Sequence, residues 1–188
     1  MPRSYLDHAA TTPLAAAAAE AMTRHFGLVG NASSLHASGR AARRVLEEAR
    51  ESLAATVGAR PGEVVFTSGG TEADNLAVHG AWIARRVAGP GEADGRPRVL
   101  LSSIEHHALH DLVPALVRDG ARVDRLPVTA DGIVGEPAVH EALAGPAGRA
   151  TAVASLMWVN NETGAVQPVT ALAEAARAAG AWSHSDAV

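Results

Sequence analysis

Two reactive residue types are missing from this sequence of 188 residues, which contains no cysteine and no lysine. All 16 of its basic side chains are therefore arginines. Without cysteine the chain can form no disulfide, hold no thiolate-bound metal and offer no thiol nucleophile. Without lysine it has no side-chain amine that could form a Schiff base with a carbonyl compound. Chemistry of either kind would need groups from outside this sequence.

Aromatic residues, excess positive charge and long apolar runs are also scarce. Aromatics make up 3% of the sequence and the net charge is −4, with no basic stripe. No apolar run reaches the roughly 18 residues that a membrane-spanning helix needs, and the alanines at 15–19 lack the leucine-rich centre of a signal peptide. We therefore expect neither nucleic acid nor a membrane as partner, and a cytoplasmic location.

What the sequence does contain is an alternation of apolar strand patterns and helical patterns from residue 64 onward. The length is that of one domain or a large part of one. Several of the strands are apolar on both faces, which is typical of a parallel sheet between helical layers, so we predict an α/β fold. Strands are expected at 64–66, 98–103, 121–126, 152–159 and 181–185, and helices at 13–26, 38–57, 70–87, 136–143 and 169–179. A further helix is expected after Ile104–Ala108, through about Arg118.

The chain is organised around the segment Val64–Asn75, in which a short apolar strand leads through a small-residue turn into a helix. Gly69 and Gly70 lack the Cβ atoms that would keep a ligand away from the backbone N–H groups, and Thr71 adds a hydroxyl. The positive end of the helix dipole lies at the same place, so the segment suits a phosphate group. The alternative is an ordinary capped turn between a strand and a helix.

Polar residues follow the expected strands at four places, namely Gly69–Thr71, Glu105–His107, Asn160–Glu162 and Asp186. In an open parallel sheet, ligands bind beyond the carboxyl ends of the strands. Because these four places would meet at that edge, we expect one pocket there. Taken one at a time, they could equally be helix starts, turn formers or a loop carboxylate.

Such a pocket matches pyridoxal phosphate, which has a phosphate, a flat ring, a ring oxygen and a basic ring nitrogen. Asp186 would pair with the ring nitrogen and keep it protonated, Asn161 could hold the ring oxygen, and His106 could stack on the ring and move protons. A zinc site is the alternative for His106 and His110, but no H-E-x-x-H motif or third ligand is evident. The glycine turn also matches neither common nucleotide-binding motif.

Six segments in order resemble the signatures of cysteine desulfurases of the NifS/IscS-like group, which serve iron–sulfur cluster assembly and belong to the class V aminotransferase superfamily. The six are Tyr5–Pro13, Asn31–His36, Thr67–Asn75, Glu105–Ala108, Val159–Gly164 and His184–Val188.

The resemblance implies the large domain of a fold type I transferase that depends on pyridoxal phosphate. Such enzymes are homodimers that convert L-cysteine to L-alanine and pass the sulfur as a persulfide to an acceptor protein. The roles that it implies are phosphate binding by Gly70 and Thr71, ring stacking and proton transfer by His106, a ring-oxygen contact by Asn161, a ring-nitrogen contact by Asp186, and a place near the substrate for Asn31.

The resemblance covers only the front part of the family's length. The resemblance implies that residues 1–188 are the N-terminal segment plus part of the cofactor-binding large domain, without the C-terminal remainder. The family's Schiff-base lysine, persulfide-forming cysteine and substrate-binding arginine lie farther along. One hypothesis is the front portion of a cysteine desulfurase that is inactive alone; the other is a non-catalytic module that binds a partner.

Overall fold

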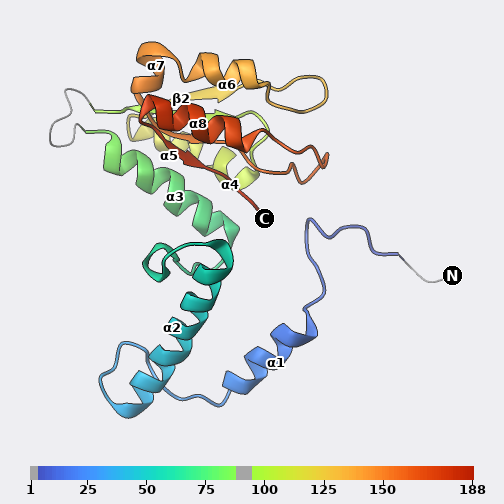
Figure 1. Cartoon of the computed structure of the whole chain (residues 1–188), viewed down its shortest axis with the longest axis vertical. Helices are drawn as coiled ribbons and strands as arrows, with labels where there is room; N and C mark the ends of the chain where they lie inside the picture. Colours follow the sequence, from blue (N-terminus) through green and yellow to red (C-terminus); the bar gives the residue numbers. More distant parts are fainter. Residues whose placement is uncertain (1–3, 88–94) are drawn as a thin grey trace. The chain divides into compact units, whose positions relative to one another are not determined.

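The computed structural model of the chain describes residues 4–87 and 95–188. These residues form two compact units, Met1–Phe66 and Thr67–Val188. Figure 1 shows the chain coloured along its sequence. The glycine- and proline-rich sequence Gly89–Pro97 predicts a loop, and most of that segment lies outside the described residues.

The first unit consists mainly of two helices, α1 (Ala16–His25) and α2 (Ala37–Val57). The prediction of a helix at 38–57 is confirmed: the His36 ring accepts a hydrogen bond from the Gly39 N–H at its start, and Gly58 ends it with a φ of 69°. Helix α1 begins later than predicted, because its N-cap is an alanine without a capping side chain.

The predicted strand at 64–66 is wrong. These residues follow the 3₁₀ turn η1 (Pro61–Glu63), and Val64 has extended backbone angles, but no strand forms there. Val65 and Phe66 are exposed. A strand needs a hydrogen-bonded neighbour, and among the described residues no other segment pairs with this one.

The second unit contains a four-stranded sheet in the order β2-β1-β3-β4. Every pairing in it is parallel, which confirms the predicted α/β fold with a parallel sheet. The strands are β1 (Arg98–Ser102), β2 (Arg122–Leu126), β3 (Thr151–Ser155) and β4 (Trp182–His184).

Helices cover both faces of the sheet (Figure 1). On one face Val99 and Leu101 pack with Trp82 and Leu116, and on the other Leu100 packs in the cluster that includes Leu172. The helices of the first face are α3 (Gly70–Arg85), α4 (His107–His110) and α5 (Val113–Arg118); those of the second are α6 (Glu136–Ala142), α7 (Gly145–Arg149) and α8 (Val169–Ala179). The doubly apolar strand patterns are thereby explained.

Two helical predictions need correction. The helix expected to run through about Arg118 is divided into α4 and α5, because Pro114 near the start of α5 has no N–H to continue the α4 ladder. The glycines and the proline of Gly145–Gly148 predict a break after the helix at 136–143, but these residues lie in the short helix α7, where Pro146 occupies the first turn, which tolerates proline. Strand β3 also ends four residues earlier than predicted.

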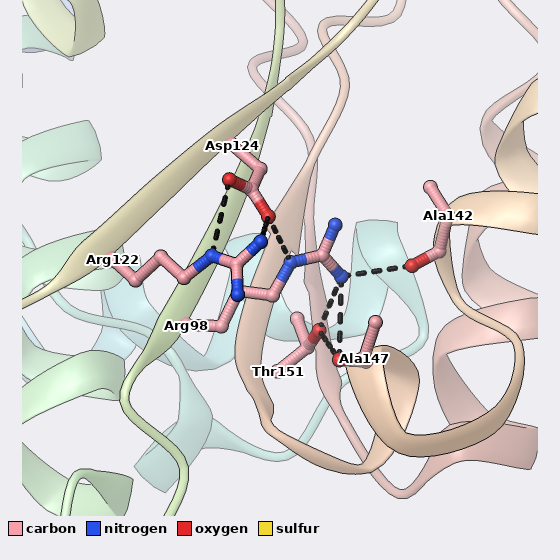
Figure 2. Close-up of polar contacts among 6 residues, drawn as sticks. All are labelled: Arg98, Arg122, Asp124, Ala142, Ala147 and Thr151. Atoms are coloured by element: carbon pink, nitrogen blue, oxygen red, sulfur yellow. Dashed lines mark hydrogen bonds and ion pairs between the residues drawn. The ribbon is translucent and has the colours of Figure 1, made fainter.

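Arg98 ties the amino end of the sheet together (Figure 2). Its side chain is 7% exposed, and its Nε donates to Asp124 Oδ2 of β2 at 2.6 Å. Its Nη1 donates to the Ala142 carbonyl at 2.8 Å and to Thr151 Oγ1 of β3 at 2.9 Å. A buried guanidinium is tolerated when its donors are satisfied in this way.

Candidate active site

Polar residues follow three strands of the sheet at its carboxyl edge. Strand β1 runs into Glu105 and His106, β3 into Asn160, and β4 into Asp186. Since β1 and β3 are neighbours whose connections lead to opposite sides of the sheet, the topological switch point lies between them. Ligands of open α/β sheets bind in the crevice at such a point.

The turn Gly69–Thr71, predicted to suit a phosphate group and called the cradle below, lies at the start of α3, a helix of 16 residues. A Cβ atom on Gly69 would meet nothing within 4 Å, and one on Gly70 would meet only the side chain of Val188, at 3.7 Å. The turn therefore leaves open space beside its backbone, and it places Gly70 next to the segment that carries Asp186. The Glu72 carboxylate accepts hydrogen bonds from the N–H and the hydroxyl of Ser68, at 2.7 and 2.5 Å, and so closes the turn.

Asn75 links this helix to the segment that carries His106. Its amide group donates to the Thr71 carbonyl at 2.8 Å and to the Ala108 carbonyl at 3.0 Å. His106 caps α4 by accepting the Ala108 N–H at its Nδ1 atom, at 3.2 Å. A neutral His106 ring therefore carries its proton on Nε2. The ring is exposed.

Asp186 lies just beyond β4, where its backbone carbonyl accepts the Trp158 N–H at 2.8 Å. Its carboxylate accepts the Val188 N–H at 3.2 Å. The charges of Asp186 and His106 both act on Asp74 of α3. Burial and, to a smaller extent, the charge of Asp186 raise the pKa of Asp74 to about 6, while His106 opposes the rise. Gly70, His106 and Asp186 are thus brought together around the first turns of α3.

Asn161 lies on a neighbouring loop that Asn160 organises. The Asn160 side chain is buried, donates to the Ile104 carbonyl at 3.2 Å and accepts the N–H of Thr163 at 2.9 Å. This fixes the loop to the residues just before His106. Asn161 itself is exposed and donates to Glu162 Oε1 at 2.9 Å, so no hydrogen bond joins it to the three residues above.

Asn31 belongs to the first unit, where its side chain shapes a turn. Its Oδ1 accepts the Ser33 N–H at 2.9 Å and its carbonyl accepts the Ser34 N–H at 2.9 Å. These two bonds form the turn that leads toward α2. Its expected place near the substrate stays a prediction.

Glu105 is a residue of this edge to which the sequence analysis assigned no role. Its Oε1 accepts the Ser102 hydroxyl at 2.9 Å and the Met157 N–H at 3.2 Å, so it joins the ends of β1 and β3. Its Oε2 is buried and has no hydrogen-bond partner in the described part of the chain. Burial raises the pKa of Glu105 to about 7, against the opposing effect of these hydrogen bonds.

Asp74 and His184, for which the sequence predicted no role, contact each other at this edge. A sequence signal was available for Asp74: it shares its helical stripe with Val78, Ala81 and Trp82, all buried. A charged residue on the apolar face of a helix requires a partner. His184 carried no comparable signal, because its neighbours in space come from other elements, Asp74 from α3 and Ser155 from β3.

A groove of about 370 Å³ lies between α8 and β4, lined by Thr170, Glu174, Arg177 and Ser183 among others. It includes His184 but none of the predicted site residues. Across residues 4–87 and 95–188, no three His, Asp or Glu side chains gather in a way that would hold a metal ion. Within the same residues, no helix combines the length and apolar character needed to cross a membrane.

The residues at this edge fit pyridoxal phosphate in their chemistry. An open glycine turn at a helix start suits the phosphate, a carboxylate suits the ring nitrogen, and an exposed imidazole suits the ring face. The chain contains no lysine, so these groups would hold the cofactor without a covalent bond from a side chain. Fold and edge together define an α/β protein of the parallel-sheet class with a candidate site at its switch point.

The chain belongs to the aminotransferase class-V family, whose model matches residues 4–188. It is 50% identical over 186 residues to the IscS-like cysteine desulfurase of Mycobacterium tuberculosis, covering 98% of this chain and 46% of that protein. It is 37% identical to the cysteine desulfurase IscS of Dictyoglomus turgidum, covering 98% of this chain and 44% of that protein. The chain spans about half the length of the curated relatives it matches.

Solved structures give the same relationship. SspA in complex with cysteine is similar with a TM-score of 0.85 and 32% identity, over 98% of this chain and 50% of that one. DndA from Streptomyces lividans is similar with a TM-score of 0.75 and 41% identity, over 98% of this chain and 49% of that one. The prediction of a class V aminotransferase of the IscS-like cysteine desulfurase group is thereby confirmed.

Proposed function

We propose that this chain supplies the cofactor-binding part of a cysteine desulfurase that depends on pyridoxal phosphate. The reaction takes sulfur from L-cysteine, leaves L-alanine and passes the sulfur as a persulfide to an acceptor protein. The observation that carries this proposal is the gathering of Gly70, His106 and Asp186 at the switch point of the sheet. The similarity to cysteine desulfurases supports the assignment of these residues to a cofactor site.

Each residue of the candidate site has a task in this proposal. The N–H groups at the start of α3 and the Thr71 hydroxyl bind the phosphate. Asp186 keeps a proton on the ring nitrogen, and Asn161 donates to the ring oxygen. Pyridoxal phosphate supplies a ring that withdraws electrons from the amino-acid carbon. His106 covers one ring face and holds or releases a proton at Nε2, since its Nδ1 is engaged.

The proposal also says what must come from elsewhere. With neither lysine nor cysteine, the chain can provide no Schiff-base amine and no persulfide sulfur. The complete enzyme would be a cytoplasmic homodimer, with Asn31 near the substrate and a sulfur acceptor in iron–sulfur cluster assembly as partner. We propose that residues 1–188 alone release no sulfide from L-cysteine.

The test is a titration of the 188-residue chain with pyridoxal phosphate, followed by absorbance and fluorescence. We expect saturable binding that Thr71→Val and Asp186→Asn each weaken about tenfold or more, because each removes a hydrogen bond to a charged group. Asp131→Asn, in an exposed turn, is the matched control and should bind like the wild type.

Borohydride treatment of the same mixture should leave no pyridoxyl group on any side chain, as mass spectrometry would detect. L-Cysteine added to the loaded chain should yield no sulfide. Binding that does not saturate, or that ignores both variants, would refute the cofactor site. A site-specific reduced adduct would refute the claim that the chain holds the cofactor without a covalent bond.

The second candidate is a non-catalytic module that binds a partner protein. The absence of both reactive residues from the sequence favours it. It predicts a stable, folded chain with no measurable affinity for pyridoxal phosphate. The same titration therefore distinguishes the two candidates.

A further inference from the structure

Asp74 is a buried carboxyl to which the proposed mechanism gives no task. It is 5% exposed and lies on the face of α3 that packs on the sheet, in one stripe with Val78 and Trp82. Burying a carboxyl on an apolar helix face costs free energy unless a partner compensates. Its retention there requires a partner.

The partner is His184 at the end of β4. The Nε2 atom of His184 lies 3.5 Å from Asp74 Oδ1, and both side chains are largely buried. The Nδ1 atom of His184 lies 2.9 Å from the Ser155 hydroxyl of β3. Because an ionised carboxylate can only accept, the neutral ring carries its proton on Nε2, the atom that faces Asp74, and Nδ1 accepts from the Ser155 hydroxyl. The Ser155 hydroxyl also lowers the pKa of Glu105, the other carboxyl near this contact. The three residues therefore connect α3, β3 and β4.

This connection ends at Asp186. His184 and Asp186 are two residues apart on an extended segment, so their side chains leave the backbone on the same side. The charge of Asp186 acts on both other groups: it raises the pKa of Asp74, and it partly offsets the lowering of the His184 pKa by burial. His106 is the other charged group that acts on Asp74.

We propose that Asp74 is a positioning residue which, through His184, holds the end of β4 against α3 and so sets the place of Asp186. Gly70 and Asp74 lie one turn apart on α3, so the cradle and the connection belong to one rigid element. The ionised Asp74 adds a second negative charge beside Asp186, which favours a proton on a ring nitrogen bound there. This inference rests on the proposed function only in naming that ring.

Ser155 is not a nucleophile in this arrangement, although serine, histidine and aspartate in series resemble a hydrolase triad. Its side chain is fully buried within β3, where no substrate carbonyl could approach. A triad serine must be open to the substrate. The series therefore positions residues and does not form a second catalytic centre.

The test reads the His184 ring directly by ¹⁵N NMR of the histidine-labelled, full-length chain without cofactor. We expect the ring to be in the Nε2–H form at neutral pH. The ¹⁵N chemical shifts of its two nitrogens should change near pH 6, as Asp74 loses its proton. Asp74→Asn preserves a hydrogen-bond acceptor but removes the charge, so the change near pH 6 should disappear. Asp131→Asn, an exposed control, should retain it.

Two further measurements complete the test. Ser155→Ala removes the donor to Nδ1 and should mix the two neutral ring forms, which provides a second variant if Asp74→Asn does not fold. In a titration with pyridoxal phosphate, Asp74→Asn and His184→Gln should each weaken binding about threefold to tenfold. The double variant should be no weaker than the worse single one, as expected of residues that act in series.

If the ¹⁵N chemical shifts of the His184 ring are the same in the wild type, in Asp74→Asn and in Ser155→Ala, the inference is wrong. Additive losses in the double variant would also overturn it, since they would mean two independent effects. A wild-type chain that binds no pyridoxal phosphate would refute the proposed function, while the NMR result would still decide whether Asp74 positions His184. The two failures are thus distinguishable.

Discussion

At the scale of single residues, Glu105 shows how burial and hydrogen bonding compete. Its carboxyl is 4% exposed, and only one of its oxygens has partners. Burial, the larger effect, raises its pKa to about 7, while the bonds from Ser102 and Met157 act in the opposite direction. At neutral pH the side chain is therefore close to half protonated, and its ionised form is costly.

We predict that Glu105→Gln changes the pH dependence of stability. A carboxyl whose pKa is raised in the folded state binds its proton more tightly there than in the unfolded chain, so wild-type stability falls as pH rises from about 4.5 to about 7. The variant lacks this loss. Between pH 5 and pH 8, the free energy of unfolding measured in urea should fall by about 2.5 kcal/mol more in the wild type than in Glu105→Gln.

The control for Glu105 is Glu141→Gln, which removes an exposed carboxyl on α6. Its unfolding free energy should follow the wild type at both pH values. Parallel curves for wild type and Glu105→Gln would show that Glu105 does not titrate in this range, and would contradict the prediction.

At the scale of elements, Arg98 connects parts of the sheet that hydrophobic packing alone would leave independent. It bonds to Asp124 of β2, to Thr151 at the start of β3 and to the carbonyls of Ala142 and Ala147 (Figure 2). Burial opposes the ionisation of Asp124, but Arg98 and then Arg122 outweigh it, so the pKa of Asp124 lies below its ordinary value.

We predict that Arg98→Lys destabilises the second unit by about 2–4 kcal/mol, because an ammonium cannot reach all these acceptors and leaves buried groups unpaired. Arg122→Ala is the matched control. Arg122 also pairs with Asp124, at 3.3 Å, but its side chain is 73% exposed. Exposed pairs contribute less than about 1 kcal/mol.

Chemical denaturation at pH 7 measures both arginine variants. Equal losses for Arg98→Lys and Arg122→Ala would show that the charge near Asp124 matters and the buried bonds do not. That result would contradict the role assigned to Arg98.

At the scale of the whole molecule, the hydrophobic core is distributed unevenly. Both core clusters lie within the second unit. In the first unit, α1 has no buried residue and α2 buries only Gly39 and Ala54. Isolated helices of about ten residues are marginal in water.

We predict that hydrogen exchange separates the two units. Amides of β1 and β3 should exchange slowly, near the rate set by global unfolding of the second unit, while those of α1 should exchange within seconds to minutes. Mass spectrometry of peptides from the exchanged chain would measure both. Protection of α1 as strong as that of β3 would contradict the prediction and indicate that another surface covers α1 in solution.

Most elements of the second unit could be predicted because their signals are local. Helix α8 and strand β1 follow from apolar period and bounding residues, and both are confirmed. The strand at 64–66 was wrong because an apolar extended segment becomes a strand only beside a partner. Partner choice is non-local and left no signal in the segment itself.

The candidate site divides in the same way. Gly70, His106, Asn161 and Asp186 could be nominated from the sequence, since each follows an apolar run or opens a helix. Their roles with pyridoxal phosphate stay predictions. No role could be predicted for Glu105 and His184 from the sequence. Glu105 contacts Met157, and His184 contacts Asp74 and Ser155, and these contacts join residues from 29 to 110 positions apart.

The sequence by itself determined the class of fold, the family and the absence of lysine and cysteine, because periodicity, motif order and composition are properties of the chain alone. Only the tertiary structure decided that the strands pair in the order β2-β1-β3-β4 and that Asp74, His184 and Asp186 meet. Burial and Coulomb interaction depend on neighbours in space. The pKa values at this edge therefore follow from the packing of α3 on β3 and β4.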